Sequence, residues 1–185
     1  MSIQRMILSM LLMITCGTAL AETPTVASTL PPLSIADRGE LKLEDNEFSF
    51  TPWGSEQNPG KVHIVQYFGG TKNDSEIFKP FTDLLQETFD LGTYHVTTII
   101  NLDAALWGTS GFVVSEVKVN KRNFPLSTMV LDEDGTGVTA WQLGERGAGL
   151  VILDRQGIVK YFTTEAMSTR EMAESVDLVR SNMDS

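Results

Sequence analysis

The pattern of hydrophobic and polar positions divides the chain into alternating strands and helices. Residues 62–68 form a nearly unbroken apolar and aromatic run, which is typical of a central strand covered on both faces. Residues 94–101 are rich in β-branched side chains and predict the next strand. Between these strands, Asn73 with Glu76 predicts a capping box that starts a helix. The apolar face of this helix consists of Ile77, Phe78, Phe81, Leu84, Leu85 and Phe89.

The alternation continues in the second half of the chain. Residues 112–123 predict a helix, although valine is frequent in them, and residues 127–131 predict a strand. The segment Asp132-Glu133-Asp134-Gly135 is typical of a turn. Residues 138–143 predict a short helix, in which we expect Trp141 to belong to the core.

A hairpin and a helix end the chain. Residues 149–154 and 158–162 flank Arg155-Gln156-Gly157, which indicates a hairpin. Ser168 with Glu171 predicts the capping box of the last helix. This order of elements favours an α/β fold, a sandwich around a mixed central sheet whose last strands are antiparallel.

The amino-terminal residues 1–21 have the layout of a secretory signal peptide. Arg5 precedes an apolar stretch, and small residues two apart predict cleavage after Ala21. The stretch is shorter than the roughly 20 apolar residues that span a bilayer, so we expect no membrane attachment after cleavage. Cys16 is a poor match to a lipid-accepting cysteine because Thr15 stands before it, and we expect Cys16 to leave with the signal.

The expected cleavage changes the composition of the chain. The signal contains Arg5 and no acidic residue, so the formal net charge moves from −10 to −11, and the remaining 164 residues contain no cysteine. This acidity argues against nucleic acid as a partner, because nucleic-acid binding rewards Lys and Arg. Residues 22–38 contain three prolines without periodicity and predict an extended lead-in, an N-terminal extension before one domain at 39–185. Short strands are expected at 40–42 and 47–51.

Two quoted segments carry a resemblance to a known fold. "GKVHIVQYF" (60–68) resembles the strand that leads into the redox loop of thiol-disulfide oxidoreductases. "FPLSTMVLDEDGTGVTAWQLGERGAGLVILDRQGIV" (124–159) resembles the carboxy-terminal half of the same proteins. The resemblance implies a thioredoxin-like three-layer sandwich.

The residues that redox chemistry needs are missing from this resemblance. Counted from Tyr67 to Pro80, the two cysteine positions of the family fall at Lys72 and Ser75, and its cis-proline falls at Ala148. Thiol exchange requires a thiolate, which neither Lys72 nor Ser75 can form. We therefore expect no thiol-disulfide oxidoreductase or thiol peroxidase activity.

Five segments are similar to the YtfJ-type proteins of Gram-negative bacteria. They are the signal, "PPLSIADRGEL" (31–41), "TTIINLDAA" (97–105), the Phe124-Pro125 region and "AWQL" (140–143). This resemblance implies a thioredoxin-like, exported protein of the periplasm without the paired cysteines. It implies no molecular activity.

The turn at Lys72, Asn73, Asp74 and Ser75 is the first candidate ligand site. It opens a helix, and the N–H groups of a helix start bind anions, so a small anionic ligand is one interpretation. The alternative is that Asn73 and Asp74 are ordinary caps, since Asp74 would repel an anion.

The second candidate lies where other loops would meet this turn. Trp107 stands beside two glycines in the loop 102–111, which suits a binding rim or a side chain that covers the core. Ala148 would complete a groove with Trp107 and the turn.

No motif indicates a metal or a cofactor. His63 and His95 are expected to be packed or hydrogen-bonded strand residues, because they lack partners at metal-ligand spacing. The series Asp132, Asp134 and Thr136 imitates a calcium loop, but the closing position falls at Leu143, which cannot coordinate calcium.

The sequence leaves two classes of function open. A non-catalytic binding or interaction module of the cell envelope would show an exposed apolar patch and would bind an envelope protein or a small ligand. A non-redox enzyme would instead gather titratable groups with shifted pKa values in the groove. Because no nucleophile with a neighbouring base stands out, the first class is favoured.

Overall fold

The computed structural model describes residues 21–105 and 108–183, which form a seven-stranded sheet with five helices. The strands are β1 (Ser34–Glu44), β2 (Glu47–Gly54), β3 (His63–Gly69), β4 (His95–Asn101), β5 (Thr128–Asp132), β6 (Gly149–Leu153) and β7 (Val159–Thr163). The helices are α1 (Lys72–Ser75), α2 (Lys79–Thr88), α3 (Ser110–Asn123), α4 (Thr136–Ala140) and α5 (Thr169–Met183). None of the helices in these residues is long and apolar enough to cross a membrane.

The sheet has the spatial order β2-β1-β5-β4-β3-β6-β7. Strands β3, β4 and β5 are parallel to one another, whereas β1, β2, β6 and β7 pair antiparallel with their neighbours. The predicted α/β sandwich around a mixed sheet with antiparallel last strands is therefore confirmed. The carboxyl ends of the three parallel strands therefore lie at the same end of the sheet. Helix α1 follows β3 there, and helix α4 follows β5.

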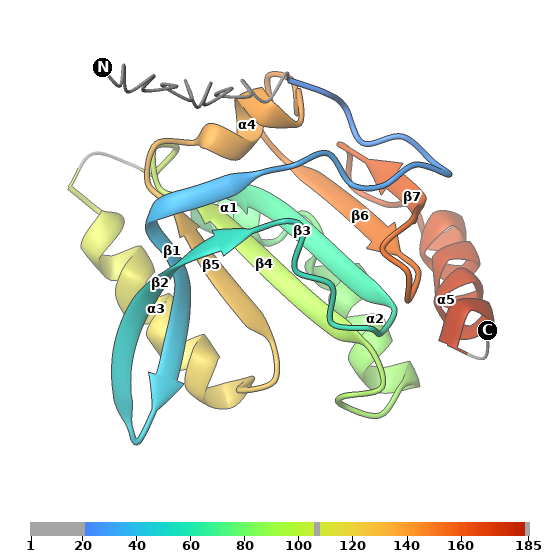
Figure 1. Cartoon of the computed structure of the whole chain (residues 1–185), viewed down its shortest axis with the longest axis horizontal. Helices are drawn as coiled ribbons and strands as arrows, with labels where there is room; N and C mark the ends of the chain where they lie inside the picture. Colours follow the sequence, from blue (N-terminus) through green and yellow to red (C-terminus); the bar gives the residue numbers. More distant parts are fainter. Residues whose placement is uncertain (1–20, 106–107, 184–185) are drawn as a thin grey trace, which may run out of the picture.

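A hydrophobic core lies on each face of the sheet, and Figure 1 shows the elements that cover the two faces. Helices α2, α3 and α5 cover one face and contribute Phe81, Val117 and Val179 to its core. The segment before β1 and the region of α4 cover the other face with Leu33 and Trp141. Trp141 is 1% exposed, so its predicted place in the core is confirmed.

The apolar run of β3 follows from these two cores. Ile64 and Phe68 face the helices α2, α3 and α5, whereas Val65 and Tyr67 belong to the core beside α4. Because both faces of the strand are covered, alternation of apolar and polar residues is lost and every residue of β3 is buried.

Strand β1 begins earlier than the sequence pattern indicates. It starts at Ser34, inside the predicted lead-in, and Ile35 pairs with Trp53 of β2. A register shift between Ile35 and Glu40 interrupts the alternation of side chains. Gly39 lies in this irregular part with a φ of +70°, and a Cβ there would come 2.2 Å from Thr51 O. The bulge therefore hides the strand from a search for period-two alternation.

The helix expected after β3 consists of two helices. Its predicted cap at Asn73 is wrong, because Thr71 caps the short helix α1. Helix α2 begins only at Lys79, with Pro80 in its first turn, where the missing N–H of proline costs no hydrogen bond. The predicted apolar face is nevertheless confirmed, because Phe81 and Leu85 are fully buried in the core.

In the second half of the chain, the predicted helix α3, the hairpin β6–β7 and the last helix are confirmed. The capping box of α5 is present, since Ser168 N donates to Glu171 Oε2 and Glu171 N donates to Ser168 Oγ. Helix α4 begins before the expected 138–143, because the carboxylate of Asp132 accepts hydrogen bonds from the N–H groups of Thr136 and Gly137 at its start.

Candidate functional site

The middle strand of the sheet is incompletely covered by helices. Helix α2 packs against α5, and α3 packs against β1 and β5, which leaves β4 between the two groups. Val96 and Thr98 of β4 are only half-buried on the helical face, although the strand stands at the centre of the sheet. A central strand with exposed side chains indicates that this face is open along its middle.

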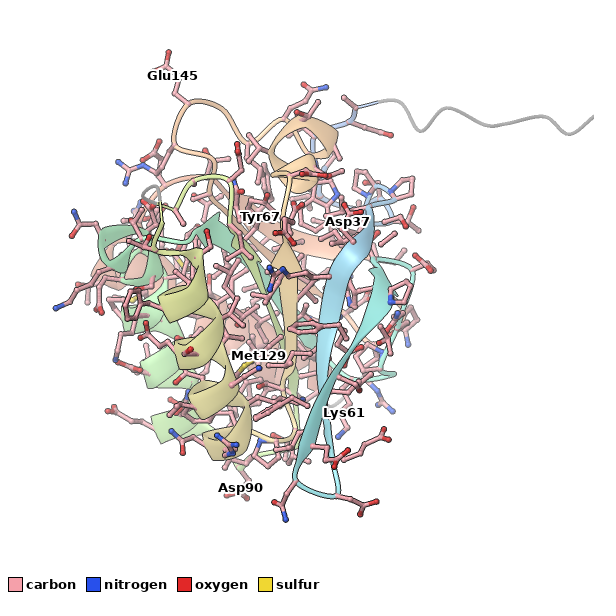
Figure 2. The ribbon with its side chains drawn as sticks, turned by 90° about the vertical axis from the view of Figure 1, so that its left-hand side faces the viewer. Asp37, Lys61, Tyr67, Asp90, Met129 and Glu145 are labelled. Atoms are coloured by element: carbon pink, nitrogen blue, oxygen red, sulfur yellow. The ribbon has the colours of Figure 1, made fainter. Side chains whose placement is uncertain are left out.

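A groove of about 980 Å³ occupies this opening. Strands β3, β4 and β5 form its floor, and helices α2 and α3 form its walls, which lie on the same side of the sheet in Figure 2, where Met129 of the floor is labelled. Helix α1 lies at one end, and the segment from Leu91 to Tyr94 lies at the other. The floor residues are Gln66, Phe68, Val96, Thr98, Ile100 and Met129.

Exposed apolar side chains gather around this groove. Among the described residues, seven large apolar side chains are exposed, and four of them line the groove: Leu91, Phe112, Phe124 and Leu126. Phe112 at the start of α3 is 78% exposed. Since exposed apolar residues are usually scattered singly, their concentration at one concave surface is typical of a binding site.

A polar pair lies at the centre of the apolar floor. Gln66 of β3 stands opposite Thr98 of β4 in the parallel register, and Gln66 Nε2 donates a hydrogen bond of 2.8 Å to Thr98 Oγ1. Gln66 is 8% exposed. Within the described part of the chain, Gln66 Oε1, its second N–H and the hydroxyl hydrogen of Thr98 have no other hydrogen-bond partner.

The candidate turn at residues 72–75 lies at one end of the groove. Lys72 and Ser75 line the groove, whereas Asn73 and Asp74 do not. Asp74 N donates to Thr71 Oγ1 at 3.2 Å, and the Thr71 hydroxyl donates to the Asp74 carboxylate at 2.6 Å. The start of this four-residue helix is thus capped by its own side chains.

Close packing explains why two glycines, Gly69 and Gly70, stand before this turn. A Cβ at Gly69 would lie 2.5 Å from Asp74 Oδ2, and one at Gly70 would lie 3.0 Å from Asn101 O. The Gly70 N–H donates to the same Asn101 carbonyl at 2.7 Å. The glycines therefore allow the turn to pack closely against the end of β4, which explains them without a ligand.

Of the other two candidate residues, the structure describes only Ala148, which does not join this groove. Ala148 is 1% exposed, belongs to the core beside α2 and α5, and does not line the groove. No cis peptide bond occurs among the described residues. Trp107 lies outside the described residues, so its two interpretations, a binding rim and a cover of the core, both remain untested.

A second polar cluster lies at the carboxyl ends of the parallel strands, on the face that α4 covers. Tyr67 donates a hydrogen bond of 2.7 Å to Asp132 Oδ2, whose carboxylate also holds the start of α4. Burial and then the charge of Asp132 raise the pKa of Tyr67 far above its ordinary value. Tyr67, labelled in Figure 2, therefore stays a proton donor that ties β3 to the turn after β5, a structural role.

The histidines are hydrogen-bonded strand residues, as predicted. His63 bonds Thr97 Oγ1 at 2.8 Å, and His95 bonds Thr128 Oγ1 at 3.0 Å. Burial, and then the neighbouring His95, lower the pKa of His63 to about 3. Among the described residues, no group of three or more His, Cys, Asp and Glu side chains could hold a metal ion.

Comparison with known proteins places the chain in a family. The model of a family described as "Bacterial protein of unknown function (YtfJ_HI0045)" matches residues 25–182. The chain belongs to this family. A YtfJ-family relative from Escherichia coli, "Uncharacterized protein YtfJ", is 34% identical over 152 residues, which cover 82% of this chain and 83% of the relative. An "Uncharacterized protein" of Haemophilus influenzae is 32% identical over the same share of each chain.

Solved structures show the fold of this YtfJ-family chain to be thioredoxin-like. A putative protein disulfide isomerase from Bacteroides thetaiotaomicron matches with a TM-score of 0.55 and 14% identity, covering 91% of this chain and 96% of that chain. A putative thiol:disulfide interchange protein DsbE from Chlorobium tepidum matches with a TM-score of 0.56 and 12% identity, covering 87% and 99%. At this identity the likeness extends to the fold alone.

The groove floor of this YtfJ-family chain was missed by the sequence reasoning, although a signal for it is present. Gln66 interrupts the apolar run of 62–68, and Thr98 stands in the middle of 94–101. Two polar residues at the centres of two adjacent parallel strands are unusual in a sheet covered on both faces. The candidate residues were instead sought in the loops, where Lys72 and Ser75 reach only the end of the groove.

Proposed function

We propose that this chain is an exported, non-redox binding protein of the cell envelope, and that its groove between α2 and α3 holds a small apolar molecule. The observation that carries the proposal is the concentration of exposed apolar side chains around an uncovered central strand. A volume of about 980 Å³ falls within the range of small-molecule pockets, which are mostly apolar with a few placed polar groups. The periplasm is the proposed location because of the signal-like residues 1–21.

The non-redox part of the proposal rests on the lack of a cysteine thiol after residue 21. The chain contains one cysteine, Cys16, in the segment expected to be removed. Lys72 and Ser75, which the thioredoxin resemblance aligns with the cysteine positions, lie at the end of the groove and cannot form a thiolate. A chain without a thiol in its folded domain has no group for thiol-disulfide exchange.

A binding function is favoured over a non-redox enzyme by the placement of the titratable groups. The strongly shifted pKa values belong to His63 and Tyr67, and neither residue lines the groove. Catalytic sites collect such groups in the cleft itself. The acidic and basic residues of the groove lie on α1, α2 and α3 or, for Glu76, directly after α1: Lys72, Glu76, Lys79, Asp83 and Glu116.

The test is the binding of a neutral apolar dye, N-phenyl-1-naphthylamine, to protein purified after expression of the full chain. We expect saturable binding of one dye per chain. Phe112→Ser should weaken binding about tenfold, because burial of a phenylalanine-sized surface contributes about 1.5–3 kcal/mol. Val119→Ser is the matched control, since Val119 is also exposed on α3 but does not line the groove.

Three results would contradict the proposal. The first is the absence of saturable binding, and the second is an equal loss in the Phe112 and Val119 variants. The third is a concentration-dependent dimer that Phe112→Ser dissociates, measured by light scattering, since the groove would then hold a second copy of the chain.

A further inference from the structure

The side chain of Gln66 is a polar group in an otherwise apolar floor, and it makes one hydrogen bond within the described residues. Its neighbours on the groove floor, apart from Thr98, are apolar. Among the described residues, the only buried side-chain oxygen or nitrogen without a hydrogen-bond partner is the Tyr161 hydroxyl, so the unpaired Gln66 Oε1 is reached from the groove. One hydrogen bond, to Thr98 Oγ1, leaves Gln66 Oε1 and one N–H open to the groove. These open groups specify what a ligand must present.

The open groups form a set of two donors and one acceptor. Gln66 offers Oε1 as an acceptor and its second N–H as a donor, and the hydroxyl of Thr98 still has a hydrogen to donate. A cis secondary amide, as in a lactam ring, matches this set, because its carbonyl and its N–H lie on the same side. The carbonyl accepts from the two donors, and the N–H donates to Oε1. An ester has no N–H and leaves Oε1 unpaired.

A carboxylate fits the floor poorly. Its oxygens would meet Gln66 Oε1, and a charge without a partner is costly to bury. The two lysines that line the groove lie at its rim, Lys72 on α1 and Lys79 on α2, and Lys79 is paired with Asp83. The floor therefore selects a neutral ligand.

The position of the pair determines where the amide lies within the ligand. Thr98 stands midway along β4 and its register partner in β5 is Met129. Phe68 and Ile100 continue the floor toward α1, and Val96 and Tyr94 continue it toward the other end. Apolar surface thus extends to both sides of the polar pair.

From these positions we infer that the groove binds a neutral cis secondary amide, as in a lactam ring, with an apolar group on each side of the amide. The inference rests on the proposed function and names the chemical class of its ligand. Gln66 Oε1 accepts a hydrogen bond from the amide N–H, and the second N–H of Gln66 and the hydroxyl of Thr98 donate to the carbonyl.

The test is displacement of N-phenyl-1-naphthylamine by three twelve-carbon probes: δ-dodecalactam as the amide, δ-dodecalactone as the ester, and dodecanoate. The amide should displace the dye at about one tenth of the ester concentration, because the ester leaves a buried acceptor unpaired. Dodecanoate should be the weakest competitor. In Gln66→Leu, the preference for amide over ester should disappear.

Two variants serve as controls. Gln86→Leu makes the same substitution at an exposed glutamine of α2 that lines the rim, and it should keep the tenfold preference. Thr98→Val should weaken amide and ester alike, because both carbonyls lose the same hydroxyl donor, and should keep the preference.

The outcomes separate this inference from the proposed function. If the dye binds and Phe112→Ser weakens it, but amide and ester compete equally in the unmodified protein, the ligand class is wrong and the binding function stands. A preference for the amide that survives Gln66→Leu also overturns the inference. A protein that binds neither dye nor probes overturns the proposed function itself.

Discussion

Gln66 and Thr98 stand directly opposite each other on β3 and β4 and share a hydrogen bond of 2.8 Å at the centre of the helix-facing surface of the sheet. Apolar residues occupy the neighbouring positions on that face, Ile64 and Phe68 in β3 and Val96 and Ile100 in β4. The pair therefore interrupts an otherwise apolar surface at the place where the helices leave the sheet uncovered.

The first prediction follows from this interruption. The double variant Gln66→Leu, Thr98→Val should be as stable as the unmodified protein or up to about 1 kcal/mol more stable, because replacing both partners by apolar groups of similar shape is nearly neutral or stabilising. Urea denaturation measures the change. A loss of several kcal/mol would show that the pair serves the fold, and would remove the reason to assign it to a ligand.

The second prediction concerns the cap of α1. Thr71→Ala should lower the free energy of unfolding by about 0.5–2 kcal/mol, because Asp74 N loses the acceptor that caps the helix. Asn73→Ala should change it by less than about 0.5 kcal/mol, since Asn73 is exposed and is not the cap. Thermal unfolding of the two variants makes the comparison, and the reverse order of effects would refute the assignment of Thr71.

The third prediction concerns pH. Burial lowers the pKa of His63 to about 3, well below its unfolded value of about 6.5, so the unfolded chain binds a proton first as the pH falls. The stability that neutral His63 contributes is present above about pH 6.5 and is lost between pH 6.5 and 3, by up to about 1.4 kcal/mol per pH unit.

Urea denaturation between pH 7.5 and 4.5 isolates this contribution. His63→Gln should flatten the pH dependence relative to the unmodified protein, and an unchanged slope would contradict the prediction. His95→Gln should remove only part of the slope, because burial also lowers the pKa of His95, whereas burial is a larger cause of the shift at His63 than the neighbouring His95.

The fourth prediction concerns redox chemistry. Protein purified after expression of the full chain should not accelerate the reduction of insulin disulfides by dithiothreitol, because Lys72 and Ser75 supply no thiolate. The variant Lys72→Cys, Ser75→Cys provides the matched comparison, since it restores a Cys-x-x-Cys spacing on the same turn. Turnover by the unmodified protein above the rate without protein would contradict the proposed non-redox function.

The sequence predicted the elements whose signals are local. The unbroken apolar run of β3 and the capping box at Ser168 and Glu171 can each be recognised within a few residues, and both are present. The cap of α1 was predicted wrongly because two candidates lie two residues apart. Thr71 with Asp74 and Asn73 with Glu76 have the same spacing, and only the folded chain distinguishes them.

The groove could not be predicted because it depends on where the helices pack against the sheet rather than on where they occur in the sequence. The sequence indicates both α2 and α3, but not that α2 packs toward α5 while α3 packs toward β1 and β5. That separation exposes β4. Phe112 looked like an ordinary apolar residue of a helix until the fold placed it at the rim of an open surface.

The most direct test of the account is backbone amide chemical-shift mapping of isotope-labelled protein titrated with N-phenyl-1-naphthylamine. The account predicts saturable shifts confined to the groove: β4 around Thr98, β3 around Gln66, and the walls near Phe112 and Leu126. Residues of the opposite core, such as Trp53 and Trp141, should not shift. Saturable shifts on that opposite face, with an unperturbed β4, would contradict the assignment of the groove as the binding site.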